Sequence, residues 1–135
     1  MAGGDPFDRA LGELERTLNA NAQRMAKIKR RIAEIRRQRS AGRSHRDIVE
    51  AAHGDLIVQL ITEATQALDE VGARVRRTEA LALYREGMTM EEIAERFGVT
   101  RQRVSALLRD AGGEVSRGSE RARAPTGRRT AARRG

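Results

Sequence analysis

The chain has 135 residues, of which 34% are charged and 2% aromatic, and it carries a net charge of +8. This length suits one domain with appendages and excludes an enzyme core beside a separate binding domain. The absence of cysteine excludes disulfides and thiolate zinc sites, and no apolar run approaches the roughly 20 residues of a membrane-spanning helix. The excess of basic residues predicts a polyanionic partner, of which nucleic acid is the natural one.

The first predicted element is a long helix that begins at Pro6 and ends near Arg39, after a disordered N-terminus over residues 1–6. Asp5 can cap this helix, and proline is favoured at its first position. Its apolar positions alternate in spacing between three and four residues, which predicts a coiled-coil-like heptad seam. The nine heptad positions, all apolar except Asn21, are Phe7, Leu11, Leu14, Leu18, Asn21, Met25, Ile28, Ile32 and Ile35.

The charges that flank this seam favour an antiparallel partner. A parallel pair of these helices would place Arg31 beside Arg36, and the two cations would repel. An antiparallel pair would instead place Glu15 beside Lys29, although such exposed pairs contribute only tenths of a kcal/mol. Asn21 is the one polar position, and we expect it to be buried there and to fix the register. The sequence thus predicts a homodimer built from these arms.

A second antiparallel partner lies within the chain. Ten basic residues and a single acid occupy residues 24–46, whereas residues 47–72 hold six acids and neither lysine nor arginine. This complementarity predicts a helical hairpin with its turn at residues 40–43. The second arm repeats the spacing of three and four, so its predicted seam is Ile57, Ile61, Ala64, Leu68, Val71 and Val75. One such arm can cover only part of the first seam, which leaves the rest for a second chain.

The turn is followed by a segment with two interpretations. Ser44 and Asp47 can form a capping box, and residues 42–50 parallel residues 87–95 further along the chain. This parallel could mark a second copy of the motif to which residues 87–95 belong. The next helix, however, begins with the apolar run at 56–58, whereas the helix that follows residues 87–95, at residues 101–109, is basic. We therefore favour a structural corner.

The stretch from Thr78 to Arg109 predicts two short helices joined by a tight turn. Thr89 and Glu92 form a capping box that starts the first helix. Gly98 can adopt the left-handed conformation that ends it, and Thr100 can cap the helix at residues 101–109. The apolar positions that close one small core are Ile93, Ala94, Phe97, Val99, Val104, Leu107 and Leu108.

These positions match the helix-turn-helix signature. The run GVTRQRVSALLR resembles the DNA-reading helix of domain four of bacterial sigma factors and of related small bacterial regulators. The resemblance covers about a quarter of the chain. It implies a trihelical DNA-binding domain at residues 77–110, which would follow a hairpin and dimerisation arm at residues 7–76.

In that family the second helix lies in the major groove with its first residues toward the base edges. The resemblance therefore implies that the base-facing residues are Thr100, Arg101, Gln102, Ser105 and Arg109, with Arg103 nearer a phosphate. Arginine and glutamine pair bidentately with guanine and adenine. The alternative is a trihelical protein-binding module. The segregation of basic residues on this helix, which has no acid at 101–109, argues against that alternative.

Residues 111–135 have no apolar periodicity and are rich in arginine, glycine, proline and serine, which predicts a disordered basic tail. The segment at 125–129 could act as a minor-groove arginine hook, but a low-complexity tail is the simpler interpretation.

Catalysis would need a positioned base, nucleophile or metal, and the chain offers only His45 and His53 with no thiol. We expect no enzyme activity, no cofactor and no metal site. The sequence predicts an all-α protein, located in the cytoplasm at the nucleoid, that binds double-stranded DNA specifically and regulates transcription as a dimer, with no membrane association. Two alternatives are a sigma-like module that binds RNA polymerase and an architectural protein that coats DNA.

Overall fold

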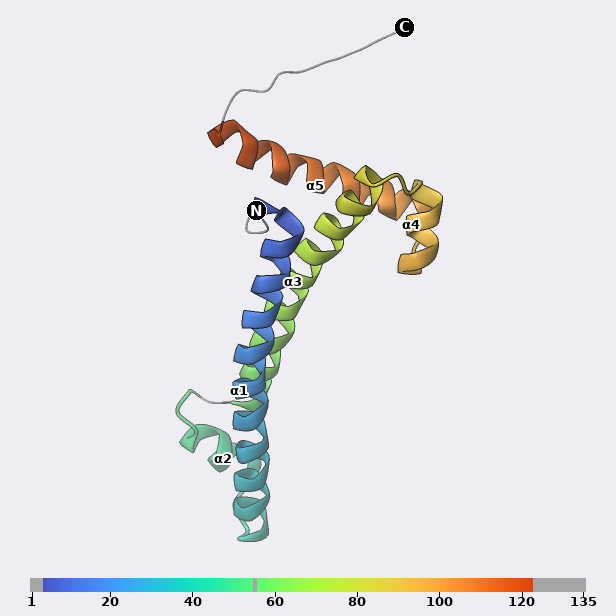
Figure 1. Cartoon of the computed structure of the whole chain (residues 1–135). Helices are drawn as coiled ribbons and strands as arrows, with labels where there is room; N and C mark the ends of the chain where they lie inside the picture. Colours follow the sequence, from blue (N-terminus) through green and yellow to red (C-terminus); the bar gives the residue numbers. More distant parts are fainter. Residues whose placement is uncertain (1–3, 55, 123–135) are drawn as a thin grey trace, which may run out of the picture. The chain divides into compact units, whose positions relative to one another are not determined.

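The computed structural model describes residues 4–54 and 56–122, with side chains as far as Gly113. This described part of the chain is all-helical and contains no strand, which confirms the predicted fold class (Figure 1). None of its helices is both long and apolar enough to cross a membrane. The elements are α1 (Pro6–Ser40), α2 (His45–Ala51), α3 (Ile57–Arg85), α4 (Met90–Phe97) and α5 (Arg101–Ala122).

The bounds of α1 agree with the prediction. The Phe7 N–H donates to the Asp5 carboxylate at 3.0 Å, so Asp5 satisfies a backbone donor that a helix start leaves open. Pro6 is the first helical residue. Residues 1–3 of the N-terminus expected to be disordered lie outside the described residues.

The chain divides into two units. One, the hairpin unit, comprises Ala10–Ala73. The other, the helix-turn-helix unit, comprises Arg74–Gly135 together with Met1–Arg9. The helix α3 passes from the first unit into the second without interruption. The assignment of separate roles to residues 7–76 and 77–110 stays a prediction.

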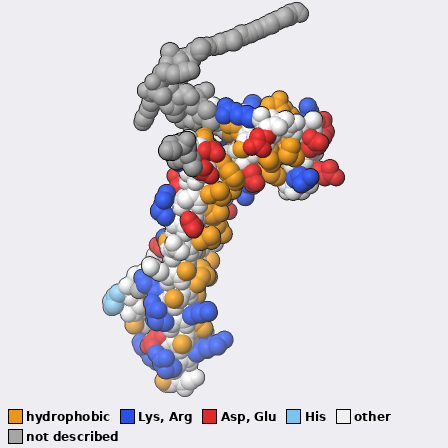
Figure 2. Space-filling view, viewed as in Figure 1, with side chains coloured by type: hydrophobic (Ala, Val, Ile, Leu, Met, Phe, Trp, Pro, Cys, Tyr) orange, Lys and Arg blue, Asp and Glu red, His pale blue; other side chains and the backbone are white. Residues whose placement is uncertain are grey.

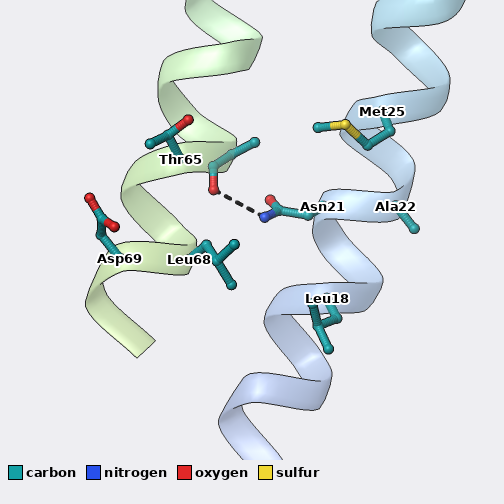
Figure 3. Close-up of a pocket in the computed structure, with 8 residues that line it drawn as sticks. Leu18, Asn21, Ala22, Met25, Thr65, Leu68 and Asp69 are labelled. Carbon is teal, nitrogen blue, oxygen red and sulfur yellow. Dashed lines mark hydrogen bonds between the residues drawn. The ribbon is translucent and has the colours of Figure 1, made fainter. Parts of the chain in front are cut away.

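In the hairpin unit, α1 and α3 run antiparallel and side by side (Figure 1). Asn21 reaches from α1 toward α3, and its amide donates to the Ala64 carbonyl at 3.0 Å (Figure 3). Its other amide atom, Oδ1, accepts from Arg24 at 2.7 Å, and Arg24 also lies 3.6 Å from the Glu63 carboxylate. The polar seam residue therefore fixes the register within one chain, because both ends of its amide are satisfied there.

The heptad seam of α1 is only half covered within the hairpin unit. One set of seam positions is half-buried, comprising Leu14, Asn21, Ile28 and Ile35. The other set remains exposed, comprising Leu11, Leu18, Met25 and Ile32. In a symmetric coiled coil one partner helix would cover both sets. Here the covered side of α1 is displaced to one edge of the seam, so the second set is left in solvent.

The predicted seam of α3 is partly wrong. Ala64 and Val71 are buried as expected, but Ile61 and Leu68 are exposed. Leu60, which is 5% exposed, and the half-buried Ala67 lie on the covered side instead. Two alanines at this contact allow a close approach of the helices, and the larger side chains are left at the edge of the contact.

The segment after the turn forms a corner. The Asp47 N–H donates to the Ser44 hydroxyl at 3.1 Å and so starts α2, but the reciprocal bond of a capping box is absent between these two described residues. Aspartate is one methylene shorter than the glutamate that normally closes such a box. Val58 and Ile61 are 66% and 48% exposed on the first turns of α3, where a second DNA-reading helix would present polar side chains to solvent. This observation favours the structural corner.

The predicted end of the last helix at Arg109 is wrong, since α5 continues to Ala122. Ala111 is 0% exposed and continues the buried face of Val104 and Leu107 at spacings of three and four. Packing of this third turn outweighs the cost of Gly112 and Gly113, each of which disfavours a helix by about 1 kcal/mol. The tail expected to be disordered is therefore helical over 111–122, and its remainder, 123–135, lies outside the described residues.

Candidate nucleic-acid interface

One small core holds the end of α3, α4 and α5 together. Its buried members are Ala80, Ile93, Ala94, Val104 and Leu107. The predicted positions Phe97 and Leu108 pack against this cluster, as do Leu83, Met88 and Met90. Ala94 is 7% exposed, so a larger side chain there would push helices apart. The core fixes which side of α5 faces inward.

Capping bonds start α4 and α5 as the sequence predicts. The Glu92 N–H donates to the Thr89 hydroxyl at 3.1 Å, and the Thr89 N–H donates to the Glu92 carboxylate at 2.9 Å. At the start of α5, the Arg103 N–H donates to the Thr100 hydroxyl at 3.0 Å. Each bond satisfies a backbone donor that the first turn of a helix leaves free.

The turn between these helices depends on Gly98, which adopts a φ of 70° in the left-handed region. Its N–H caps α4, and the Val99 N–H donates to the Ala94 carbonyl at 3.0 Å. The expected burial of Val99 is wrong, because its side chain is 36% exposed. A residue directly after a left-handed glycine leaves the helical path, so spacing along the helix does not fix the side on which it lies.

Gly98→Ala should lower the free energy of unfolding of the helix-turn-helix unit by about 1–2 kcal/mol, because only glycine adopts a positive φ without a steric cost. A Cβ at this position would meet nothing within 4 Å, so the cost is conformational. The matched control is Gly112→Ala inside α5, where a Cβ is also unobstructed. This control should raise stability by up to about 1 kcal/mol. Amide hydrogen exchange in α4 and α5 measures both changes, and two changes of the same sign would contradict this account.

The solvent side of α5 carries three of the predicted base-facing residues. Gln102, Ser105 and Arg109 follow one another at spacings of three and four, so they share one side of the helix. Val104 and Leu107 occupy the opposite, buried side. Gln102 and Arg109 are exposed, and Ser105 is half-buried. The face is polar and free of acid over its first turns.

The three other predicted residues lie beside this face. Arg101 and Arg103 are exposed on its two flanks. Thr100 is exposed directly before the helix, and its hydroxyl already accepts the capping bond. Within the described part of the chain, the side chains of Gln102 and Arg103 make no hydrogen bond or ion pair.

Arg101 and Arg109 of this surface each make one side-chain interaction with a neighbouring residue. Arg101 Nε lies 2.9 Å from the Glu91 carboxylate, which connects α5 to the first turn of α4. Both side chains are more than half exposed, at 59% and 68%, so the pair is worth at most about 1 kcal/mol and can be exchanged for a phosphate or a base. Arg109 Nη1 donates to the Ser105 hydroxyl at 3.2 Å. These interactions orient the guanidinium groups without burying them.

Two residues of this surface are not predicted from the sequence. In the sequence Glu91 is simply an acid at a helix start, where the helix dipole favours it, and only the packing of α4 on α5 brings it to Arg101. Ala106 is half-buried at the edge of the solvent side, where its methyl group can contact a thymine methyl. The sequence feature that could have identified Ala106 is its spacing, because a residue four positions after Gln102 lies on nearly the same side of the helix. No group of three or more His, Cys, Asp or Glu side chains in the described residues could hold a metal ion.

Residues 73–116 match the model of the Homeodomain-like domain family. The match covers the end of α3, α4, and most of α5, so the chain carries a helix-turn-helix domain of a type that suggests DNA binding. No curated protein and no solved structure matches the chain, and the resemblance to sigma factors has no further support.

Proposed function

We propose that this protein is a sequence-specific, double-stranded DNA-binding regulator of transcription that reads the major groove with residues 101–109 of α5 and acts as a dimer. The observation that carries the proposal is the exposed, acid-free side of α5 on a helix-turn-helix core. A helix of this width fits the major groove, where each base pair presents its own pattern of donors and acceptors.

The residues divide into two roles under this proposal. Gln102 and Arg109 lie on the solvent side and would meet base edges, as would Arg101 after exchange of its Glu91 partner. Arg103, on a flank, would meet a phosphate, and Thr100 and Ser105 would add hydroxyl contacts. Phosphate contacts set the position of the helix, and base contacts set the preferred sequence.

The test is selection of bound duplexes from a random DNA pool, followed by binding measurements on the selected sequence and a scrambled one. We expect a defined motif and a preference of at least about a thousandfold over scrambled DNA, as specific regulators show. Binding without any motif would instead identify an architectural protein that coats DNA. Absence of DNA binding, with capture by RNA polymerase, would identify a sigma-like interaction module.

Removing residues 123–135 deletes five arginines and no acid. We expect this truncation to weaken binding to all DNA sequences alike and to flatten the slope of log K against log salt, by about 0.9 for each phosphate that these arginines neutralise. Because α5 ends at Ala122, the cut removes none of the described helices. An unchanged salt slope would show that these arginines do not contact phosphates.

A further inference from the structure

The hairpin unit leaves a set of large apolar side chains in solvent, here called the apolar stripe. Its members are 38–66% exposed: Leu11, Leu18, Met25 and Ile32 on α1, and Val58, Ile61 and Leu68 on α3. Hydrophobic side chains follow the length of the hairpin in Figure 2. Single exposed apolar residues are ordinary, but a continuous row of them marks an interaction surface.

Spacing and a groove show that the stripe is continuous across the two helices. The four members on α1 are seven residues apart, as are Ile61 and Leu68 on α3, so each set keeps to one side of its helix. A groove of about 480 Å³ joins the two sets, because Leu18, Met25 and Leu68 all line it. Asn21 lies on its floor with its amide already bonded to α3 (Figure 3).

The size of the stripe suits a small dimer. Side chains of this kind, exposed to this extent, offer on the order of 600 Å² per chain, so two chains would bury on the order of 1,200 Å², near the lower end for stable interfaces. The hydrophobic effect favours such burial at roughly 25 cal/mol per Å² of apolar surface. Burial of the stripe requires a partner surface that is equally apolar. The stripe of a second copy of this chain is such a surface.

Charge polarity of the hairpin unit selects the orientation of the second copy. Eight basic residues and one acid occupy residues 24–40, toward the turn. The other end holds Glu13, Glu15, Asp69 and Glu70 against Arg16. Basic side chains gather at the turn end of the hairpin in Figure 2. A parallel copy would set the basic ends together, whereas an antiparallel copy sets each basic end beside an acidic one.

The border of the stripe repeats this polarity. Glu15 and Lys29 each follow a stripe residue of α1 by four positions, so both lie along the same outer border. They are also equally distant, by seven residues, from Ala22, a small residue that lines the groove. A two-fold axis at Ala22 therefore brings Glu15 of each copy opposite Lys29 of the other.

We propose that a second copy of this chain docks antiparallel on the apolar stripe, with the two-fold axis at Ala22 and Leu18 of each copy packed near Met25 of the other. This inference rests on the proposed function in one respect: the dimer would present two helix-turn-helix units to DNA. The axis lies within the hairpin unit, and both copies contribute the same surface, as a two-fold interface requires.

Sedimentation of the full chain without DNA tests the association. We expect the wild-type chain to sediment as a dimer and Leu18→Glu with Met25→Glu to sediment as a monomer, with a dissociation constant raised at least about a hundredfold, because four carboxylates would be buried. Both positions are exposed, at 49% and 43%, so helical content should persist. The control, Tyr84→Glu at a 46% exposed residue of the other unit, should remain dimeric. A monomeric wild-type chain would overturn the proposal and would leave a different partner protein as the occupant of the stripe.

Cross-linking tests the orientation on an otherwise intact stripe. The chain has no native cysteine, so introduced thiols are the only reactive ones. A mixture of the Glu15→Cys and Lys29→Cys variants should cross-link with a short thiol reagent, whereas either variant alone should not. Cross-linking of each variant with itself would indicate a parallel dimer and would overturn the proposal. If the wild-type chain is a dimer but shows no preference for any DNA sequence, the proposed function is refuted, whereas the proposed dimer interface is not.

Discussion

Ile93→Ala should lower the free energy of unfolding of the helix-turn-helix unit by about 2–5 kcal/mol, the usual cost of truncating a buried isoleucine. Ile93 is 0% exposed and belongs to the cluster that holds α4, α5 and the end of α3 together. Because Ile93 is shielded from solvent, water cannot fill the cavity that its truncation would leave. We also expect DNA binding to weaken, because the side of α5 that faces solvent is set by this core.

Amide hydrogen exchange in α4 and α5 is the suitable measurement, since it reports the local stability of one unit in a chain that has two. Val104→Ala and Val49→Ala provide a matched pair, as the two valines are 0% and 53% exposed. The first should destabilise by more than about 1 kcal/mol, and the second should be nearly neutral. An Ile93→Ala effect as small as that of Val49→Ala would show that this core is not the one that supports α5.

Replacing both Arg101 and Gln102 with alanine should relax the base preference by about 1–3 kcal/mol for each bidentate base interaction that the change removes, while the fold persists. Both side chains are exposed on the first turn of α5. Removal of Arg101 also breaks its pair with Glu91, but an exposed pair contributes at most about 1 kcal/mol to stability. The discrimination between the selected DNA sequence and single-base variants of it is the quantity to measure.

Gln23→Ala with Arg30→Ala is the matched control, because it removes the same two residue types and the same charge from exposed positions of α1. Both positions belong to the hairpin unit, and they lie on the side of α1 away from the apolar stripe. The control should keep the full base preference and lose at most a small, salt-dependent part of its affinity. If the double variant of α5 keeps its preferred site at unchanged affinity, residues 101–109 do not read the DNA sequence.

Local sequence determined where most helices begin and how α4 and α5 are joined. The capping residues Asp5, Thr89 and Thr100 and the left-handed Gly98 act where the sequence places them. Each of these features depends on hydrogen bonds or backbone angles within about four residues, so distant parts of the chain cannot alter them. The solvent side of α5 follows from the same local spacing. The sequence therefore predicts the candidate interface residues, although their role in binding DNA stays a prediction.

Tertiary packing determined two features that the spacing of residues along the sequence does not predict. The pairing of Arg101 with Glu91 joins two helices, and the extension of α5 follows the burial of Ala111.

The heptad spacing of α1 is the same whether its partner is α3 or another chain. Only the tertiary structure shows that α3 covers the side of Leu14 and Ile28 and leaves Leu18 and Met25 exposed. Small residues such as Ala64 set how closely two helices approach, and that distance decides which neighbouring side chains are covered. The choice of covered face is therefore a property of both helices together, which neither helical pattern contains by itself.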